Sequence, residues 1–119
     1  MAHVALPESA AATTHSRQSV GRFADTAVPA LVAAMQAAGA EPNPRRYVVK
    51  LVGGANFGGL SDVFNIGRRN ILALKRILWE QGLGAVSEDL GGQQSRCVCV
   101  DVNTGSVRVT TPDGRSQLL

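Results

Sequence analysis

The chain opens with Met1-Ala2-His3-Val4-Ala5-Leu6-Pro7-Glu8-Ser9, and we expect the rest of the fold to be organised around this segment. It contains His3, one of only two histidines, followed by a short apolar run that stops at a proline. Proline cannot donate a hydrogen bond to a sheet, so Val4–Leu6 is typical of the end of a strand. A lone histidine is more often a surface or packed residue than a catalyst, so pattern alone leaves the role of His3 open.

Two later stretches have the apolar spacing of amphipathic helices. The first is predicted over Asp25–Gly39, with Asp25 as its N-cap and Gly39 as the residue that ends it. Its apolar side chains recur at i, i+3, i+4 and i+7, namely at Val28, Leu31, Val32 and Met35. The second helix is predicted over Asn65–Gln81, with Asn65 as its cap.

The predicted strands are runs of β-branched and apolar residues between turn signals: Tyr47–Val52, Ala85–Leu90, Arg96–Val102 and Ser106–Thr111. Glu8–Arg22 is predicted to be a loop, and Pro112–Leu119 a flexible tail. With 119 residues, the chain fits a single domain spanning 1–119. The order strand, helix, strand, helix and then a run of strands indicates a mixed α/β or α+β domain.

A glycine-rich loop, Gly53-Gly54-Ala55-Asn56-Phe57-Gly58-Gly59, follows the strand at Tyr47–Val52. It lacks the Gly-Lys-Ser/Thr of a phosphate-binding loop, and its glycine spacing does not fit a dinucleotide fingerprint. Glycines permit tight turns and close backbone approach. The Asn56 side chain is a candidate for tying the loop together.

Composition excludes several classes of protein. The net charge is +3, but the twelve basic residues are scattered and the aromatic residues are few, so we expect no nucleic-acid partner. No apolar run approaches the roughly 18 residues of a membrane helix. Met1–Ser9 also lacks the basic start of a signal peptide. We therefore expect a soluble, cytoplasmic protein without membrane insertion.

The two cysteines, Cys97 and Cys99, lie on a predicted strand. We expect them to point to opposite faces of that strand and to be buried thiols in a reducing compartment. Two cysteines make neither a disulfide framework nor a zinc site. We therefore expect no metal and no cofactor.

A set of ordered motifs resembles the CheD family of chemoreceptor glutamine deamidases. The segment Ala2–Ser9 is similar to the family's histidine motif. The first helix, the glycine-rich loop, the start of the second helix and two C-terminal motifs follow in the family's order, at Phe23–Leu31, Gly53–Phe57, Ile66–Asn70, Glu88–Gly92 and Asp101–Gly105. The resemblance runs from His3 to about Thr111 and so covers nearly the whole chain.

The resemblance implies a compact, single-domain α/β fold, an α/β/β layered sandwich of the CheD and deamidase-toxin type. It implies a hydrolase whose cysteine thiolate attacks a glutamine carboxamide on a methyl-accepting chemotaxis receptor, giving glutamate and ammonia. The histidine that activates the thiol and protonates the leaving amine corresponds to His3. Gly53, Gly54 and Asn56 are expected to form the wall of the substrate site. Chemoreceptors are the implied partners, with the CheC phosphatase as a possible second partner.

The chain departs from the family pattern at its start. In the family, the nucleophilic cysteine and a threonine that orients the histidine precede the histidine motif, whereas Met1 and Ala2 alone precede His3 here. We therefore expect an N-terminally truncated chain without the nucleophile segment. The alternative to an enzyme is a non-catalytic module that binds receptors or CheC. Neither Cys97 nor Cys99 is expected to substitute as nucleophile, and His15 is expected on the surface.

Overall fold

From the first α-helix onward, the α-helices and strands follow the predicted order, with one additional strand at the C-terminus, whereas the strand expected at Val4–Leu6 is only an isolated bridge. The computed structural model describes residues 1–10, 20–58 and 65–119. In chain order its elements are the 3-10 helix η2 (Val20–Arg22), α1 (Ala24–Ala37), the 3-10 helix η3 (Pro44–Arg46), β1 (Val49–Gly53), α2 (Ile66–Glu80), β2 (Ala85–Leu90), β3 (Cys97–Val100), β4 (Val107–Thr110) and β5 (Ser116–Leu118).

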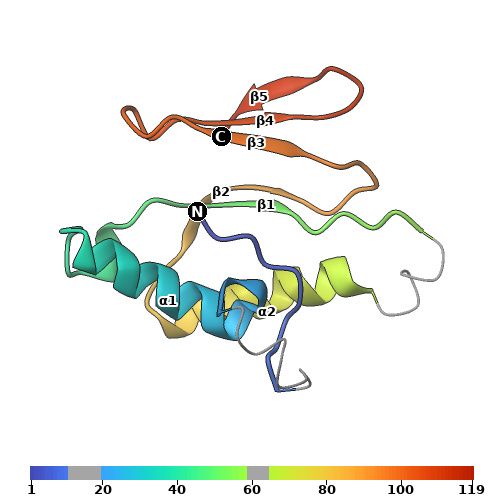
Figure 1. Cartoon of the computed structure of the whole chain (residues 1–119). Coiled ribbons are helices and arrows are strands. Elements are labelled where there is room, and N and C mark those ends of the chain that lie inside the picture. Colours follow the sequence, from blue (N-terminus) through green and yellow to red (C-terminus); the bar gives the residue numbers. More distant parts are fainter. Residues whose placement is uncertain (11–19, 59–64) are drawn as a thin grey trace.

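The strands form two small sheets. β1 and β2 pair in parallel, with Leu51 opposite Glu88, and α2 makes the crossover that a parallel pair requires. β3, β4 and β5 form an antiparallel sheet in that order. Figure 1 shows α1 and α2 on one side of the parallel pair and the three-stranded sheet on its other side. The chain is thus a compact, single-domain α/β protein with one parallel and one antiparallel sheet.

The hydrophobic core lies where the two helices meet the parallel pair. Its buried side chains come from both helices, from β1 and from the turn after α2: Ala24, Val28, Leu51, Ala73, Ile77, Leu78 and Leu83. Burying one aliphatic side chain contributes about 1.5–3 kcal/mol, so this cluster is what holds α2 against β1. Val4 packs against the same cluster and attaches the N-terminal segment to it. No helix in the described part of the chain is long and apolar enough to cross a bilayer.

The helix ends differ in part from the prediction. Phe23, not Asp25, occupies the N-cap position of α1, and no side chain caps that end. The Asp25 carboxylate instead accepts hydrogen bonds from the backbone N–H (2.9 Å) and the hydroxyl (2.7 Å) of Ser9. Asn65 does precede α2, with a φ of 44°, but its side chain makes no capping bond. Gly39, with a φ of 89°, follows α1 as a C-terminal glycine does.

The prediction of a flexible tail over Pro112–Leu119 was wrong, because these residues include β5. β5 pairs with β4, which would otherwise be an exposed sheet edge. The Lys50 ammonium, on β1, donates to the backbone carbonyl oxygen of Leu119 at 2.5 Å. The C-terminus therefore links the antiparallel sheet to the parallel pair.

The prediction of buried cysteines was also wrong. Cys97 and Cys99 are free thiols, and both are exposed on β3. Side chains alternate along a strand with a period of two, so residues two apart share a face rather than pointing to opposite faces. Val98, between them, is half-buried.

Candidate functional site

A pocket of about 490 Å³ brings His3 together with the loop that follows β1. Its wall includes Gly53, Gly54 and Asn56, the three residues that the resemblance assigns to a substrate site. The rest of the wall comes from the start of α2 and from the β2–β3 connection, through Ile66, Gly67, Asn70, Gln94, Ser95 and Arg96 among others. The fold therefore assembles this pocket from four separate segments of the chain.

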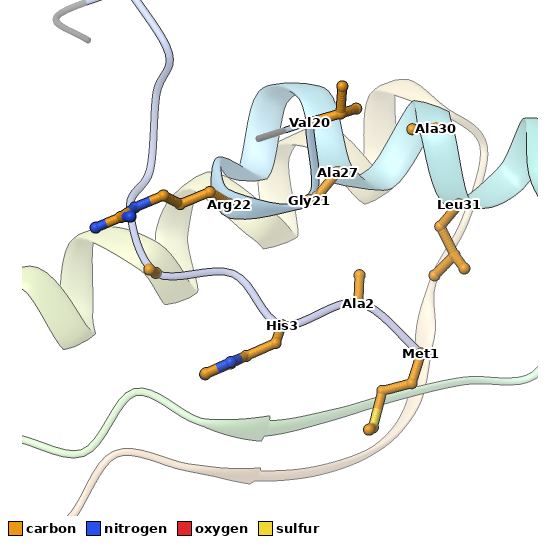
Figure 2. Close-up of a pocket in the computed structure, with 10 residues that line it drawn as sticks. Met1, Ala2, His3, Val20, Gly21, Arg22, Ala27, Ala30 and Leu31 are labelled. Atoms are coloured by element: carbon orange, nitrogen blue, oxygen red, sulfur yellow. The ribbon is translucent and has the colours of Figure 1, made fainter. Parts of the chain in front are cut away.

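His3 is held in place by the residues that follow it. The backbone N–H groups of Ala5 and Leu6 both donate to the carbonyl oxygen of Arg22, at 2.9 and 3.1 Å. The N–H of Ala24 donates back to the carbonyl oxygen of Leu6 at 3.0 Å. These bonds make an isolated parallel bridge rather than the predicted strand. The His3 side chain is exposed, and Figure 2 shows its imidazole extending away from α1.

A second pocket adjoins His3. His3 also lines an open pocket of about 660 Å³ between the N-terminal segment and α1, together with Met1, Gly21 and Leu31 (Figure 2). An exposed imidazole beside a pocket can exchange protons with a bound group and with water. This position suits a general acid and base, although the catalytic role of His3 stays a prediction.

The shape of the glycine loop depends on backbone conformations that favour glycine. Gly53 and Gly54 have φ angles of 118° and 66°. The N–H of Asn56 donates to the carbonyl oxygen of Gly92 at 2.8 Å, which ties the loop to the β2–β3 connection. The Asn56 side-chain oxygen accepts a hydrogen bond from the N–H of Gly58 at 3.2 Å, so the prediction that Asn56 ties the loop is confirmed.

The start of α2 packs directly against this loop. A Cβ atom on Gly67 would lie 2.5 Å from the carbonyl oxygen of Gly54 and 2.9 Å from that of Ala55. A Cβ on Gly54 would in turn lie 2.5 Å from the Cδ1 atom of Ile71. Only glycine fits at either position without a shift of the backbone or of a packed side chain. This close approach places the first turns of α2 at the pocket wall.

Asn70 is a wall residue that the sequence analysis quoted only as part of a helix motif. Its Nδ2 donates to the carbonyl oxygen of Ala5 at 3.0 Å. Its Oδ1 is buried and has no hydrogen-bond partner in the described part of the chain. The available signal was its spacing, because residues three apart on a helix share a face and Gly67 contacts the loop.

Arg96 is a second wall residue that the sequence analysis missed. Its guanidinium donates to the Asp89 carboxylate at 2.8 Å and to the carbonyl oxygen of Gly91 at 2.8 Å. The Arg96 and Asp89 side chains are only 11% and 19% exposed. Gln117, on β5, donates to the second oxygen of Asp89 at 2.9 Å. This network joins the end of β2 to the start of β3 and to β5, the two edge strands of the antiparallel sheet.

The hydrogen bond from Arg96 holds the pKa of Asp89 below its ordinary value, against the opposing effect of burial. Replacing Asp89 with asparagine, which keeps the shape but removes the charge, is therefore expected to cost about 1 kcal/mol of unfolding free energy near pH 7. A carboxylate whose pKa is lowered by folding stabilises the protein above its unfolded pKa and loses that contribution as pH falls through the folded pKa. The difference between wild type and Asp89→Asn should therefore shrink below about pH 4. Urea unfolding at several pH values measures it, and a constant difference at every pH would contradict this account.

The other candidates lie elsewhere. Neither Cys97 nor Cys99 lines the pocket, although Val98 between them does. His15 lies outside the described residues. Across residues 1–10, 20–58 and 65–119, no three His, Cys, Asp or Glu side chains gather to hold a metal ion. The pocket thus offers one imidazole, side-chain amides, the hydroxyl of Ser95, the guanidinium of Arg96 and loop backbone, groups that can bind a neutral carboxamide by hydrogen bonds.

Comparisons with known proteins agree with the sequence resemblance. A family model described as CheD chemotactic sensory transduction matches residues 5–111, and His3 lies just before this span. The chain is 50% identical over 117 residues to the probable chemoreceptor glutamine deamidase CheD of Syntrophotalea carbinolica, covering 98% of this chain and 72% of that protein.

Two more distant relatives give the same picture. The chemoreceptor glutamine deamidase CheD of Thermotoga maritima is 38% identical over 118 residues, covering 99% of this chain and 71% of that protein. The probable chemoreceptor glutamine deamidase CheD of Solibacter usitatus is 39% identical over 105 residues, covering 88% and 61%. With a family model matched over most of its length and such relatives, the chain belongs to the CheD family.

Proposed function

We propose that this protein is a chemoreceptor glutamine deamidase, a hydrolase that converts specific glutamine side chains of methyl-accepting chemotaxis proteins to glutamate and ammonia. The observation that carries the proposal is the pocket in which His3 meets Gly53, Gly54 and Asn56. Membership of the CheD family supports the same activity. The substrate is then a protein side chain, and no metal or cofactor takes part.

In the proposed reaction, a cysteine thiolate attacks the carboxamide carbon and forms a tetrahedral oxyanion. The intermediate collapses to a thioester, and the nitrogen leaves as ammonia after taking a proton from the His3 imidazolium. His3 then takes a proton from water, whose oxygen attacks the thioester. The thiolate leaves, and the side chain is glutamate. The balance is one water consumed and one ammonia released for each glutamine.

In this proposal the nucleophile is the cysteine that precedes the histidine in the family's pattern, as the resemblance implies. We assign the role to neither Cys97 nor Cys99, because both thiols are exposed on β3 and neither lines the pocket of His3. A thiol that never meets the general base would lack the partner that activates it.

The finer features of the proposal concern the fold and the setting. We infer an α/β/β layered sandwich of the CheD and deamidase-toxin type, formed by 1–119 as one CheD-like domain. The position of the helices and the antiparallel sheet on opposite sides of the parallel pair supports it (Figure 1). The protein acts in the cytoplasm on the cytoplasmic part of chemoreceptors, with the CheC phosphatase as a possible second partner.

One observation favours a second candidate function, a non-catalytic module that binds receptors or CheC. Both cysteines of the chain lie outside the pocket of His3. A chain that works without a nucleophile would keep the fold and its docking surface but release no ammonia.

The test compares this chain with the full product of its gene, each incubated with a glutamine-bearing chemoreceptor fragment. Ammonia release is measured, and mass spectrometry locates each glutamine that becomes glutamate. The deamidase proposal expects ammonia and site-specific glutamate from the form that carries a cysteine before His3. Receptor binding without ammonia from either form would overturn it in favour of the binding module.

A further inference from the structure

We propose that Asn70 is a positioning residue, which fixes the His3 segment against the glycine loop by a hydrogen bond to the backbone of Ala5. The inference deepens the proposed function, since it says how His3 is aimed, and it rests on that function for its kinetic consequence. Its structural consequence can be measured separately.

Backbone hydrogen bonds hold the N-terminal segment on the side of α1, and Val4 packs against the core. The bonds from Ala5 and Leu6 to Arg22 attach the segment to the turn that precedes α1. Asn70 reaches the same segment from α2, where its Nδ2 lies 3.0 Å from the carbonyl oxygen of Ala5. Ala5 is two residues after His3, so the two anchors together fix the direction in which the chain leaves toward the histidine.

The helix that bears Asn70 is itself fixed relative to the glycine loop. Gly67 approaches the carbonyl oxygen of Gly54 so closely that a Cβ would stand 2.5 Å from it. Asn70 follows Gly67 by three residues, which places both on one helix face. Through this face, α2 sets the position of Ala5, and with it His3, relative to Gly54. All of these residues except Ala5 line one pocket.

The side chain of Asn70 is better explained by positioning than by stability. Its Oδ1 is buried without a partner among the described residues, an arrangement that costs free energy rather than supplying it. Ala5 is exposed, so its carbonyl oxygen can bind water when Asn70 is replaced. The donor on Asn70 thus adds little to the stability of the fold, while it restrains a segment that carries the general base.

The test uses Asn70→Asp, which keeps the shape but presents a carboxylate to the Ala5 carbonyl, and Asn70→Leu, which removes the polar group. Backbone heteronuclear NOE values of residues 2–6 and the ring signals of His3 are followed by NMR. The chain has only two histidines, so a His15→Ala spectrum assigns the His3 ring. Asn70→Leu serves if the aspartate variant fails to fold. In both variants we expect residues 2–6 to become mobile, and in Asn70→Leu, which buries no charge, the melting temperature should change little.

Arg76→Ala is the matched control. Arg76 is also on α2 and pairs with Glu8 of the same segment at 3.3 Å, but both side chains are more than half exposed. Exposed ion pairs of this kind contribute little, so His3 should stay ordered in this variant. In Asn70→Asp, lowering the pH protonates the introduced carboxyl and restores a donor. At low pH we therefore expect the NOE values of residues 2–6 in this variant to approach those of wild type measured at the same pH.

The kinetic readout separates this inference from the proposed function. In the form of the protein that carries a cysteine before His3, both Asn70 variants are expected to lower kcat by roughly 100-fold with little change in KM, as for a misplaced catalytic group. Mobile residues 2–6 in the variants, with no ammonia from any form, would refute the deamidase and keep the positioning role. Wild-type NOE values and kcat in both variants would overturn the positioning role alone.

Discussion

Replacing His3 with alanine is expected to lower the rate of glutamine deamidation by roughly 10²–10⁴-fold in the form of the protein that carries a cysteine before His3. Histidine is the side chain most often used as a general acid and base, and His3 lines the pocket. Without it, the thiol is not activated, the amide nitrogen leaves unprotonated, and the water that hydrolyses the thioester has no base. The measurement is ammonia release against time with a receptor fragment.

The control for His3→Ala is His15→Ala, which removes the chain's other histidine and should keep full activity. His3 is exposed, so its replacement should leave the melting temperature unchanged. If the form that carries a cysteine before His3 keeps wild-type activity after His3→Ala, His3 is not the general base. If the melting temperature of the His3→Ala variant is lower than that of wild type, the loss of activity reflects unfolding instead.

The second large effect is expected for Gly67→Ala, which should destabilise the protein by about 2 kcal/mol. The added Cβ would lie 2.5 Å from the carbonyl oxygen of Gly54 and 2.9 Å from that of Ala55, and backbone atoms cannot swing aside as a flexible side chain can. Overpacking of this kind costs about 3 kcal/mol. Alanine recovers about 1 kcal/mol, because it is a better helix former than glycine.

Urea unfolding measures the change, and Gly21→Ala is the control. Gly21 also lies in a helical segment, η2, and its Cβ would meet no atom of the described residues within 4 Å. That substitution should leave the stability unchanged or slightly higher, since nothing opposes the gain in backbone order. If Gly67→Ala is as stable as wild type, the contact between α2 and the glycine loop is looser than the structure indicates.

The sequence by itself determined the order of the elements from α1 onward, and it named His3 and the glycine loop as candidates for the site. Apolar periodicity located both helices to within two residues at each end, because this signal depends on neighbours along one face. Turn residues bounded β2 closely for the same local reason. The motif around His3 and the glycine loop indicated the CheD family, which the comparisons confirm.

The tertiary structure alone decided which of these segments meet. Asp25 is a good N-cap residue by local chemistry, but its carboxylate accepts hydrogen bonds from Ser9, which lies 16 positions away in the chain. The tail became β5 because β4 offered it an unpaired edge, and such pairing is invisible to local pattern. The bond from Asn70 to Ala5 spans 65 positions, and Arg96 reaches Asp89 and Gly91 across a loop. Contacts between distant residues depend on packing, so only the folded chain places His3, the glycine loop and α2 around one pocket.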